Sequence, residues 1–288
     1  MTQQSLGVWY AADKLSAPQW IEFAKRVESL GYSTQWYSES TGFESLSFGA
    51  HLLHATTTLQ IGSSIANIYA RDSITARNGL ATLNAISGDR YVLGLGVSHV
   101  PLVEGVRGHT YGKPVATMRR YLEGIRTEQA DPDRLSVVIA ALGPRMLELS
   151  AELAAGAVPY NVTPEHTAGA KAILGPDKWL IVEQKFCLET DADRARSLAR
   201  QELSRYMGLP NYRNNWLRLG FSETDLANGG SDRFLDAMVV WGTPDTVRAR
   251  IDEHFSAGAT QVCIQPVHEP GDANAAIMSL EKLAPRAN

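Results

Sequence analysis

Short apolar runs alternate with longer amphipathic stretches along most of the chain. A short apolar run is typical of a buried strand, whereas apolar residues three and four positions apart are typical of one face of a helix. Eight runs predict strands, and they cover residues 6–10, 34–38, 60–65, 91–96, 136–140, 156–159, 179–186 and 261–266. Nearly all of these runs are followed by a helical pattern.

Helix caps support this interpretation. Ser16 and Gln19 form a capping box before the first helical pattern. The pairs 163–164 (TP) and 243–244 (TP) each place an N-cap threonine before a proline at the first helical position. Further helices are predicted at residues 72–87, 113–127, 144–154, 164–174, 191–206 and 272–283, and the pattern also indicates a helix that contains His51 and His54.

The alternation of strands and helices predicts a parallel sheet. Eight strand–helix units in 288 residues favour an α/β fold of the closed (β/α)8 type, a TIM barrel, formed by residues 1–288 as a single domain. A doubly wound open sheet is the alternative, but no G-x-G-x-x-G motif follows the first strand. Residues 98–112, after the fourth strand, and 208–240, before the last strand–helix unit, are interpreted as insertions.

Composition excludes several classes of protein. The 27 Lys and Arg residues against 31 Asp and Glu give a net charge of −4, and without a long basic stripe a nucleic-acid binder is not expected. No apolar run approaches the roughly 18 residues of a membrane helix. The polar N-terminus lacks a secretory signal core, and Cys187 and Cys263 have no partner at metal-binding spacing, so we expect a cytoplasmic protein without a metal site.

In a barrel of this type the chemistry lies at the carboxyl ends of the strands. There, Gly143 and Pro144 begin a helix whose free N–H groups suit a phosphate, and Arg145 adds a positive charge; an ordinary helix start is the alternative. His99 follows a glycine-rich strand, where the glycines allow either a ligand or a neighbouring strand to approach. The other candidates at strand ends are Tyr10, Glu39, residues 64–67, Ser98, Tyr160, Asn161, Gln184 and residues 265–268.

Three stretches of the chain resemble the bacterial luciferase-like flavin and deazaflavin oxidoreductases. They are residues 59–67 (LQIGSSIAN), 86–97 (ISGDRYVLGLGV) and 140–147 (AALGPRML), and residues 241–259 are similar to that family's final helix–strand unit. Residues 159–164 and 206–212 add a likeness to the actinobacterial branch that is associated with coenzyme F420, a deazaflavin.

The resemblance implies a barrel that holds the flavin-type ring at the strand ends, above a non-proline cis peptide that maps onto Ser64–Ile65. The family's residue over the reactive centre maps near Glu39, where several deazaflavin enzymes have Asp or His, so that Glu39 or His99 would exchange the proton that accompanies hydride transfer. Val97 stands where some members have an acidic residue. The implied cofactor contacts are Ser64, Ile65, Ala66, Asn67, Val97, Ser98, Ala141, Leu142, Gly143 and Arg145.

A deazaflavin carries hydride on carbon, so the implied function is hydride transfer between F420 and a small organic substrate. An FMN-dependent monooxygenase of the same family and a non-catalytic cofactor-binding protein are the alternatives, and an unrelated phosphate-substrate barrel is a third. Arg71, Arg107 and Lys113 favour the long anionic tail of F420, unless they are ordinary surface charges. Family members are often dimers, and the broad apolar face of residues 72–87 leads us to expect a homodimer.

Overall fold

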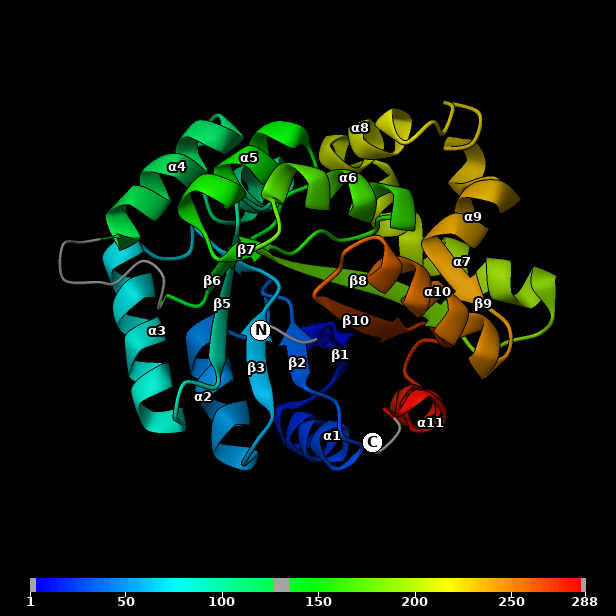
Figure 1. The fold of residues 1–288 in the computed structure, drawn as a ribbon, viewed down its shortest axis with the longest axis horizontal. Helices are drawn as coiled ribbons and strands as arrows, with labels where there is room; N and C mark the ends of the chain where they lie inside the picture. Colours follow the sequence, from blue (N-terminus) through cyan, green and yellow to red (C-terminus); the bar gives the residue numbers. More distant parts are fainter. Residues whose placement is uncertain (1–3, 127–134, 286–288) are drawn as a thin grey trace.

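The computed structural model describes residues 4–126 and 135–285. In these residues, eight parallel strands close into a barrel that helices surround (Figure 1). Strand β10 pairs with both β8 and β1, which closes the ring and confirms the (β/α)8 barrel over the open sheet. Around the barrel the strands are β1 (Ser5–Tyr10), β2 (Thr34–Tyr37), β3 (Gln60–Ser63), β5 (Tyr91–Gly96), β6 (Val137–Ile139), β7 (Gly156–Ala157), β8 (Trp179–Cys187) and β10 (Gln261–Pro266).

Helices follow the strands and cover the outside of the barrel. Two predicted caps are confirmed, because the Thr163 and Thr243 hydroxyls accept hydrogen bonds from the N–H groups of His166 and Thr246. The covering helices are α1 (Ala17–Ser29), α2 (Ser45–Ala55), α3 (Ser73–Ser87), α4 (Pro114–Ile125), α5 (Pro144–Leu153), α6 (Pro164–Leu174), α7 (Ala192–Met207), α10 (Pro244–Ser256) and α11 (Ala273–Leu283).

Both predicted insertions contain regular structure. Residues 98–112 include a short π-helical segment, η2 (Pro101–Val106), in which the N–H of Arg107 donates to the carbonyl of Leu102 at 3.1 Å. Residues 208–240 contain α8 (Pro210–Arg218), α9 (Asp232–Met238) and most of β9 (Val239–Trp241). Strand β9 pairs with the carboxyl end of β8. The second insertion therefore extends the sheet beside the barrel mouth, which is the end of the barrel formed by the carboxyl ends of its strands.

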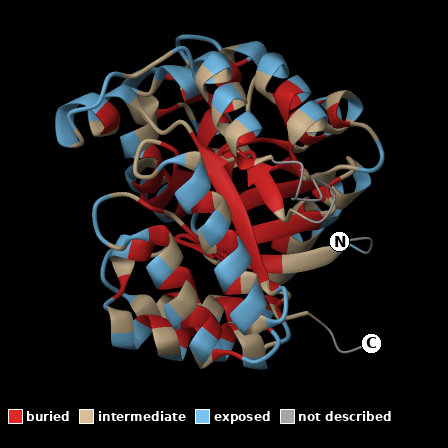
Figure 2. Cartoon of the chain, turned by 90° about the vertical axis from the view of Figure 1, so that its left-hand side faces the viewer, coloured by how far each residue is buried: buried red, intermediate tan, exposed pale blue. Residues whose placement is uncertain are grey.

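Apolar side chains fill the barrel and the layer around it. The side chains clustered inside the barrel are Trp9, Ala11, Trp36, Val92, Val138, Val158, Ile181 and Cys263. A larger cluster packs the strands against the helices and includes Ala76, Leu80 and Leu83, the predicted inward face of α3. Figure 2 shows the resulting buried strands and the exposed outer faces of the helices.

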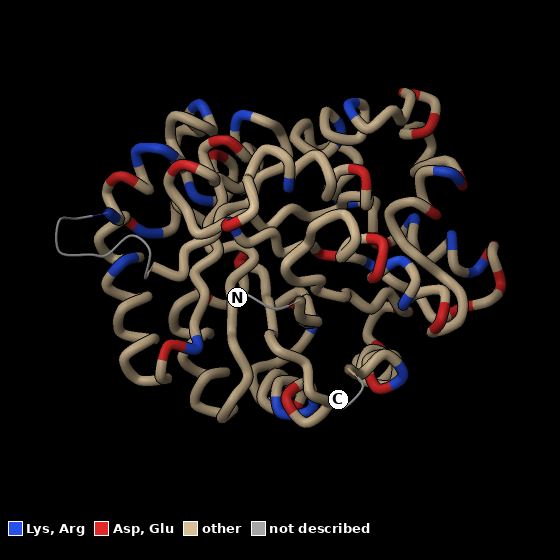
Figure 3. Tube along the Cα trace, viewed as in Figure 1, with Lys and Arg blue, Asp and Glu red and all other residues tan. Residues whose placement is uncertain are grey.

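Charged residues of both signs are scattered over the surrounding helices (Figure 3), in agreement with a chain that has no dedicated basic stripe. Across the described parts of the chain, no helix has the length and apolar character needed to cross a bilayer. The same residues hold no group of three or more histidine, cysteine or acidic side chains placed to bind a metal ion.

Candidate functional site

The third barrel strand is interrupted at its carboxyl end. The Ser64–Ile65 peptide is cis, which confirms the expectation from the family resemblance. Strand β4 (Ala66–Asn67) then pairs with β5 beyond the interruption. We call the interruption at Ser64–Ile65 the bulge. Two backbone hydrogen bonds join it to the end of β2 and the residues that follow. The N–H of Ser64 donates to the carbonyl of Tyr37 at 2.6 Å, and the N–H of Glu39 donates to the carbonyl of Ile65 at 3.3 Å. The bulge therefore has a fixed place at the barrel mouth.

The glycines of the fourth barrel strand make room for this bulge. A Cβ atom on Gly94 would lie 2.0 Å from the carbonyl oxygen of Ser63, and one on Gly96 would lie 2.5 Å from a side-chain carbon of Ile65. The Ser63 hydroxyl also exchanges hydrogen bonds with the backbone N–H and carbonyl of Gly94. Of the two interpretations open from the sequence, close packing against the neighbouring strand therefore accounts for both glycines.

Glu39 is engaged with other protein groups through both carboxylate oxygens. Its Oε1 accepts from the N–H of Ser45 at 3.2 Å, and its Oε2 accepts from the N–H of Asn67 at 2.7 Å. The guanidinium of Arg71 contacts both oxygens, and the two side chains are only 2% and 5% exposed. Arg71 also pairs with Glu44 at 2.7 Å. Glu39, which the family resemblance places near the reactive centre, is therefore held in a buried ion pair, and its exchange of a proton stays a prediction.

Val97, Ser98 and His99 follow β5 and are half-buried at the mouth. Ser98 has a positive φ of 57°, and its carbonyl accepts a hydrogen bond from the Tyr111 hydroxyl at 3.2 Å. The His99 ring lies 5.8 Å from the ring of Tyr212, which belongs to α8. Burial lowers the pKa of His99, and a hydrogen bond with Asn211 acts in the opposite direction. Neutral His99 is therefore the dominant form at pH 7, and it has no carboxylate partner among the described residues.

Helix α5 begins at the mouth with Gly143 as its N-cap, and no side chain caps it. Within the described residues, the N–H groups of Leu142 and Gly143 donate to no protein acceptor. The guanidinium of Arg218 lies beside them, since a Cβ on Gly143 would be 3.3 Å from its Nη2. Arg145 is exposed, whereas Ala141 is buried. The sequence indicated the helix start but missed Arg218, which reaches it from the second insertion.

A buried polar cluster lies at the carboxyl ends of β7, β8 and β10. The ammonium group of Lys185 donates to Asn161 at 2.6 Å and to Glu183 at 3.2 Å, and it lies 3.7 Å from the ring centre of Tyr160. Burial raises the pKa of Glu183 and lowers that of Lys185, with each group partly offsetting the shift of the other. The Tyr160 hydroxyl donates to Gln265 at 2.8 Å. Sequence reasoning missed Glu183 and Lys185, although two charged residues at alternate positions of a buried strand were a sign of them.

Gln184, by contrast, takes no part in the mouth. Its side chain donates to the carbonyl of Lys185 at 2.7 Å and to that of Met238 at 3.2 Å, and it contacts His254 at 2.9 Å. Strand alternation therefore directs this candidate toward the covering helices while its two neighbours take part in the polar cluster.

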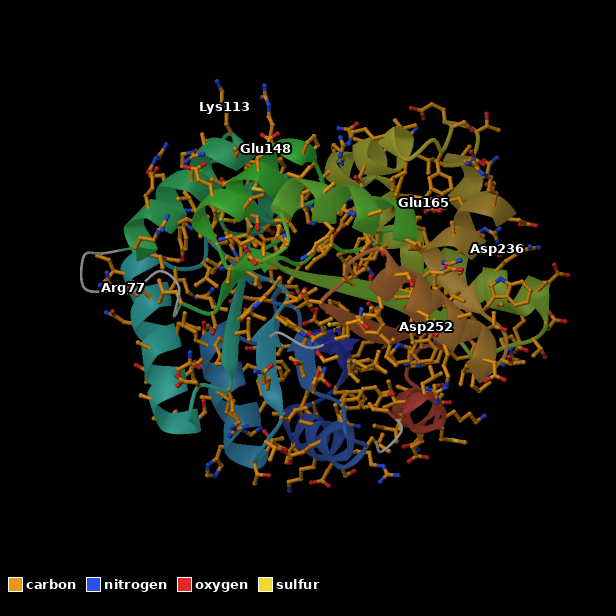
Figure 4. All side chains as sticks on the ribbon, viewed as in Figure 1. Arg77, Lys113, Glu148, Glu165, Asp236 and Asp252 are labelled. Atoms are coloured by element: carbon orange, nitrogen blue, oxygen red, sulfur yellow. The ribbon has the colours of Figure 1, made fainter. Side chains whose placement is uncertain are left out.

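The three basic residues singled out in the sequence have different surroundings. Arg71 forms ion pairs with Glu39 and Glu44. Lys113 is exposed and projects away from the fold (Figure 4). Arg107 is half-buried and lines a cavity of about 380 Å³ together with Ser40, Thr41, Val106 and His109. Of the three, Arg107 alone combines a place at a cavity with the absence of a carboxylate partner in the described residues.

Comparison with known proteins extends this picture. Residues 1–129 match the family model described as luciferase-like monooxygenase. A 5,10-methylenetetrahydromethanopterin reductase from Archaeoglobus fulgidus is 27% identical, with 83% of this chain and 87% of the relative covered.

Solved structures share the fold across nearly the whole chain. A coenzyme F420-dependent tetrahydromethanopterin reductase from Methanopyrus kandleri gives a TM-score of 0.72 at 18% identity, with 98% of each chain covered. An F420-dependent secondary alcohol dehydrogenase in complex with an F420–acetone adduct gives a TM-score of 0.76 at 13% identity, also with 98% of each chain covered. The oxygenating constituent of 3,6-diketocamphane monooxygenase from Pseudomonas putida, in complex with FMN, gives 0.72 at 14% identity, with 99% of each covered. The family resemblance is thereby confirmed: residues 1–129 carry the luciferase-like sequence pattern, and the remainder completes the same barrel fold.

Proposed function

We propose that this protein is an F420-dependent oxidoreductase that transfers a hydride between the deazaflavin and a small organic substrate. The observation that carries the proposal is the similarity in sequence, over 83% of the chain, to a protein named as a methylenetetrahydromethanopterin reductase. Two structural neighbours with the same barrel are named as F420-dependent enzymes. We propose that its partner is this small-molecule substrate and that it binds neither nucleic acid nor a membrane.

The residues at the mouth fit an anionic, ring-bearing cofactor. The free N–H groups of Leu142 and Gly143 together with the guanidinium of Arg218 offer a phosphate backbone and charged side-chain donors in one place. The ring would lie against the bulge at Ser64–Ile65 and against Val97 and Ser98, with Ala66 and Asn67 behind it. When bound, F420 supplies a two-electron hydride carried on carbon. The protein's part is to bind and orient it.

The chain's own acid–base residue is then His99. Its ring lies at the mouth, and because burial lowers its pKa, the ring is neutral at pH 7 and available as a base, while its imidazolium form gives the proton back readily. Glu39 becomes a positioning residue, since it joins Arg71 to the backbone of Asn67 beyond the bulge. Replacing His99 with Ala is expected to lower turnover by about 10²- to 10⁴-fold while leaving the dissociation constant of F420 unchanged.

The cofactor assignment is tested by titrating the purified protein with F420 and with FMN. We expect F420 to bind at least 10-fold more tightly than FMN. Arg218→Gln should weaken the binding of both cofactors by about 10-fold or more, because it removes a charge-assisted hydrogen bond to the phosphate. Arg213→Gln on the same helix is the matched control, since its guanidinium pairs with Glu223. Tighter binding of FMN would overturn the assignment to F420.

An FMN-dependent monooxygenase is the second candidate, and the FMN complex with the same fold favours it. Oxygen consumption with reduced FMN and a bound organic substrate would support it, whereas anaerobic hydride transfer from reduced F420 supports the first. A protein that binds either cofactor without any turnover would be a cofactor-binding protein, the third possibility.

We further propose that the protein is cytoplasmic and forms a homodimer through α3. This helix exposes Ile74 and Ile86, and exposed large apolar side chains favour a protein contact. Light scattering coupled to size-exclusion chromatography should give twice the chain mass of 31.4 kDa. Ile86→Lys should shift the protein toward monomer, whereas Met278→Lys on α11, which is also exposed, should not.

A further inference from the structure

The cavity beside Arg107 is a feature that the proposed cofactor contacts do not use. Ser40 and Thr41, which follow β2, form one side of it, and Val106, Arg107 and His109 from the first insertion form the other. Its volume of about 380 Å³ is in the range of small-ligand sites. Since β2 and β5 lie on either side of β3 in the barrel, the cavity is next to the bulge, whereas the start of α5 follows β6.

Arg107 is underused by the protein itself. The only hydrogen bond of its side chain among the described residues is a long one, 3.5 Å from Nη2 to the carbonyl of Ser40. Its Nε is buried without an acceptor, and no other guanidinium nitrogen in the described chain is in that position. A buried cation is costly to leave without a charged partner, and an anion in the cavity would give this guanidinium the acceptor that the described residues do not.

The rest of the lining matches an anion with an organic body. The described residues that line the cavity include no carboxylate, and the adjacent acid, Asp13, is engaged by the hydroxyl of Ser40. The hydroxyl of Thr41 and the ring of His109 add hydrogen-bonding groups. Val106 is the apolar residue of the lining, and its 64% exposed side chain can contact a carbon body.

We propose that this cavity binds the anionic group, a carboxylate or a phosphate, of the organic substrate, and that Arg107 determines this specificity. The identification of the anion as the substrate's rests on the proposed function, whereas the binding of an anion at Arg107 does not. The substrate would then have an apolar or weakly polar carbon body, which reaches the bulge at Ser64–Ile65, and a terminal negative charge.

The test measures binding by calorimetry, with benzoate and phenyl phosphate as anionic probes and benzyl alcohol as the neutral match. We expect the wild-type protein to bind both anions more tightly than the alcohol, with and without F420. Arg107→Gln should weaken anion binding by about 10- to 100-fold and leave the alcohol unaffected, because it removes a charge-assisted interaction. Arg107→Lys should retain part of the affinity. Arg77→Gln is the matched control, an arginine substitution on α3, outside the cavity (Figure 4).

Equal anion binding by wild type and Arg107→Gln would overturn the proposal, as would a failure of the wild type to bind either anion. Titrations of the same variant with F420 and FMN separate the possible sources of the anion. If Arg107→Gln weakens both cofactors, Arg107 contacts the cofactor phosphate, and if it weakens F420 alone, Arg107 contacts the F420 tail; either result refutes the substrate assignment. The proposed function fails separately, through the cofactor titration of the wild-type protein.

Discussion

Breaking the buried Glu39–Arg71 pair should destabilise the protein and weaken cofactor binding together. The perturbation is Arg71→Met, which leaves the Glu39 carboxylate in a buried site with only the N–H groups of Ser45 and Asn67 as donors. The Glu39→Gln variant makes the complementary change, because it leaves the guanidinium with Glu44 as its remaining acid. Both variants disturb the segment around Glu39, whose backbone N–H donates to the carbonyl of Ile65 in the bulge.

The magnitude follows from the burial of the pair. Removing one partner of a buried ion pair typically costs about 3–5 kcal/mol, and the two side chains here are 2% and 5% exposed. For Glu39→Gln we expect the lower end of about 3 kcal/mol, since the glutamine oxygen still accepts a backbone N–H and Glu44 still pairs with Arg71. At about 2 °C per kcal/mol for a chain of this size, the melting temperature should fall by about 6 °C for Glu39→Gln and by up to about 10 °C for Arg71→Met.

Thermal and urea unfolding of the two single variants and the double variant complete a double-mutant cycle. We expect the double variant to lose less stability than the sum of the single losses, by at least about 1 kcal/mol. Arg119→Met is the matched control, because its pair with Glu152 is 39% and 52% exposed and should contribute no more than about 1 kcal/mol. An unchanged melting temperature for Glu39→Gln, combined with a large loss of turnover, would refute a structural role for the Glu39–Arg71 pair and would favour Glu39 as the proton donor.

Three further predictions concern other parts of the barrel. Gly94→Ala should cost about 3 kcal/mol in urea unfolding, because its Cβ would overlap the Ser63 carbonyl, whereas Gly105→Ala, with open space around it, should stay within about 1 kcal/mol. Lys185→Met should cost about 3–5 kcal/mol, and Glu183→Leu added to it should recover most of that loss in the same assay. Backbone N–H groups outweigh burial and lower the pKa of Glu28 to about 2. Its contribution is therefore complete above pH 4.5 and lost as the pH falls toward 2, so the melting temperatures of wild type and Glu28→Gln should converge over that interval.

The barrel was predictable because each of its units has a local pattern. The last strand has the predicted bounds, Gln261–Pro266, and the helix Pro164–Leu174 begins at the predicted cap and ends where predicted. The ends of α2 were not predicted, since apolar residues occupy much of that helix and give a weak helical period. Strand β9, most of which lies in the second insertion, was not predicted, because its three residues are too few to show an alternating pattern.

The site was less predictable because its side chains meet through tertiary contacts. Position after a strand correctly brought Glu39 to the mouth, but its partner Arg71 lies 32 residues later, and no spacing links the two. Arg218 reaches the start of α5 from the second insertion, so the sequence around residues 141–145 contains no trace of it. Lys185 is the exception, since strand alternation places residues 183 and 185 on one face, opposite to Gln184.

The buried charges of the described chain are concentrated at one end of the barrel. Glu39 follows β2, Glu183 and Lys185 belong to the second half of β8, and Glu202 accepts a hydrogen bond from Gln265 near the end of β10. A buried ion pair is on average no more stabilising than well-packed apolar side chains, so stability alone does not account for this placement. The inside of the same barrel is filled by apolar side chains, which shows that the fold could be completed without such groups. Their position at the carboxyl ends of the strands, where barrels of this type carry their binding sites, therefore agrees with the proposed cofactor site at the mouth, whose lining these charges would hold in place.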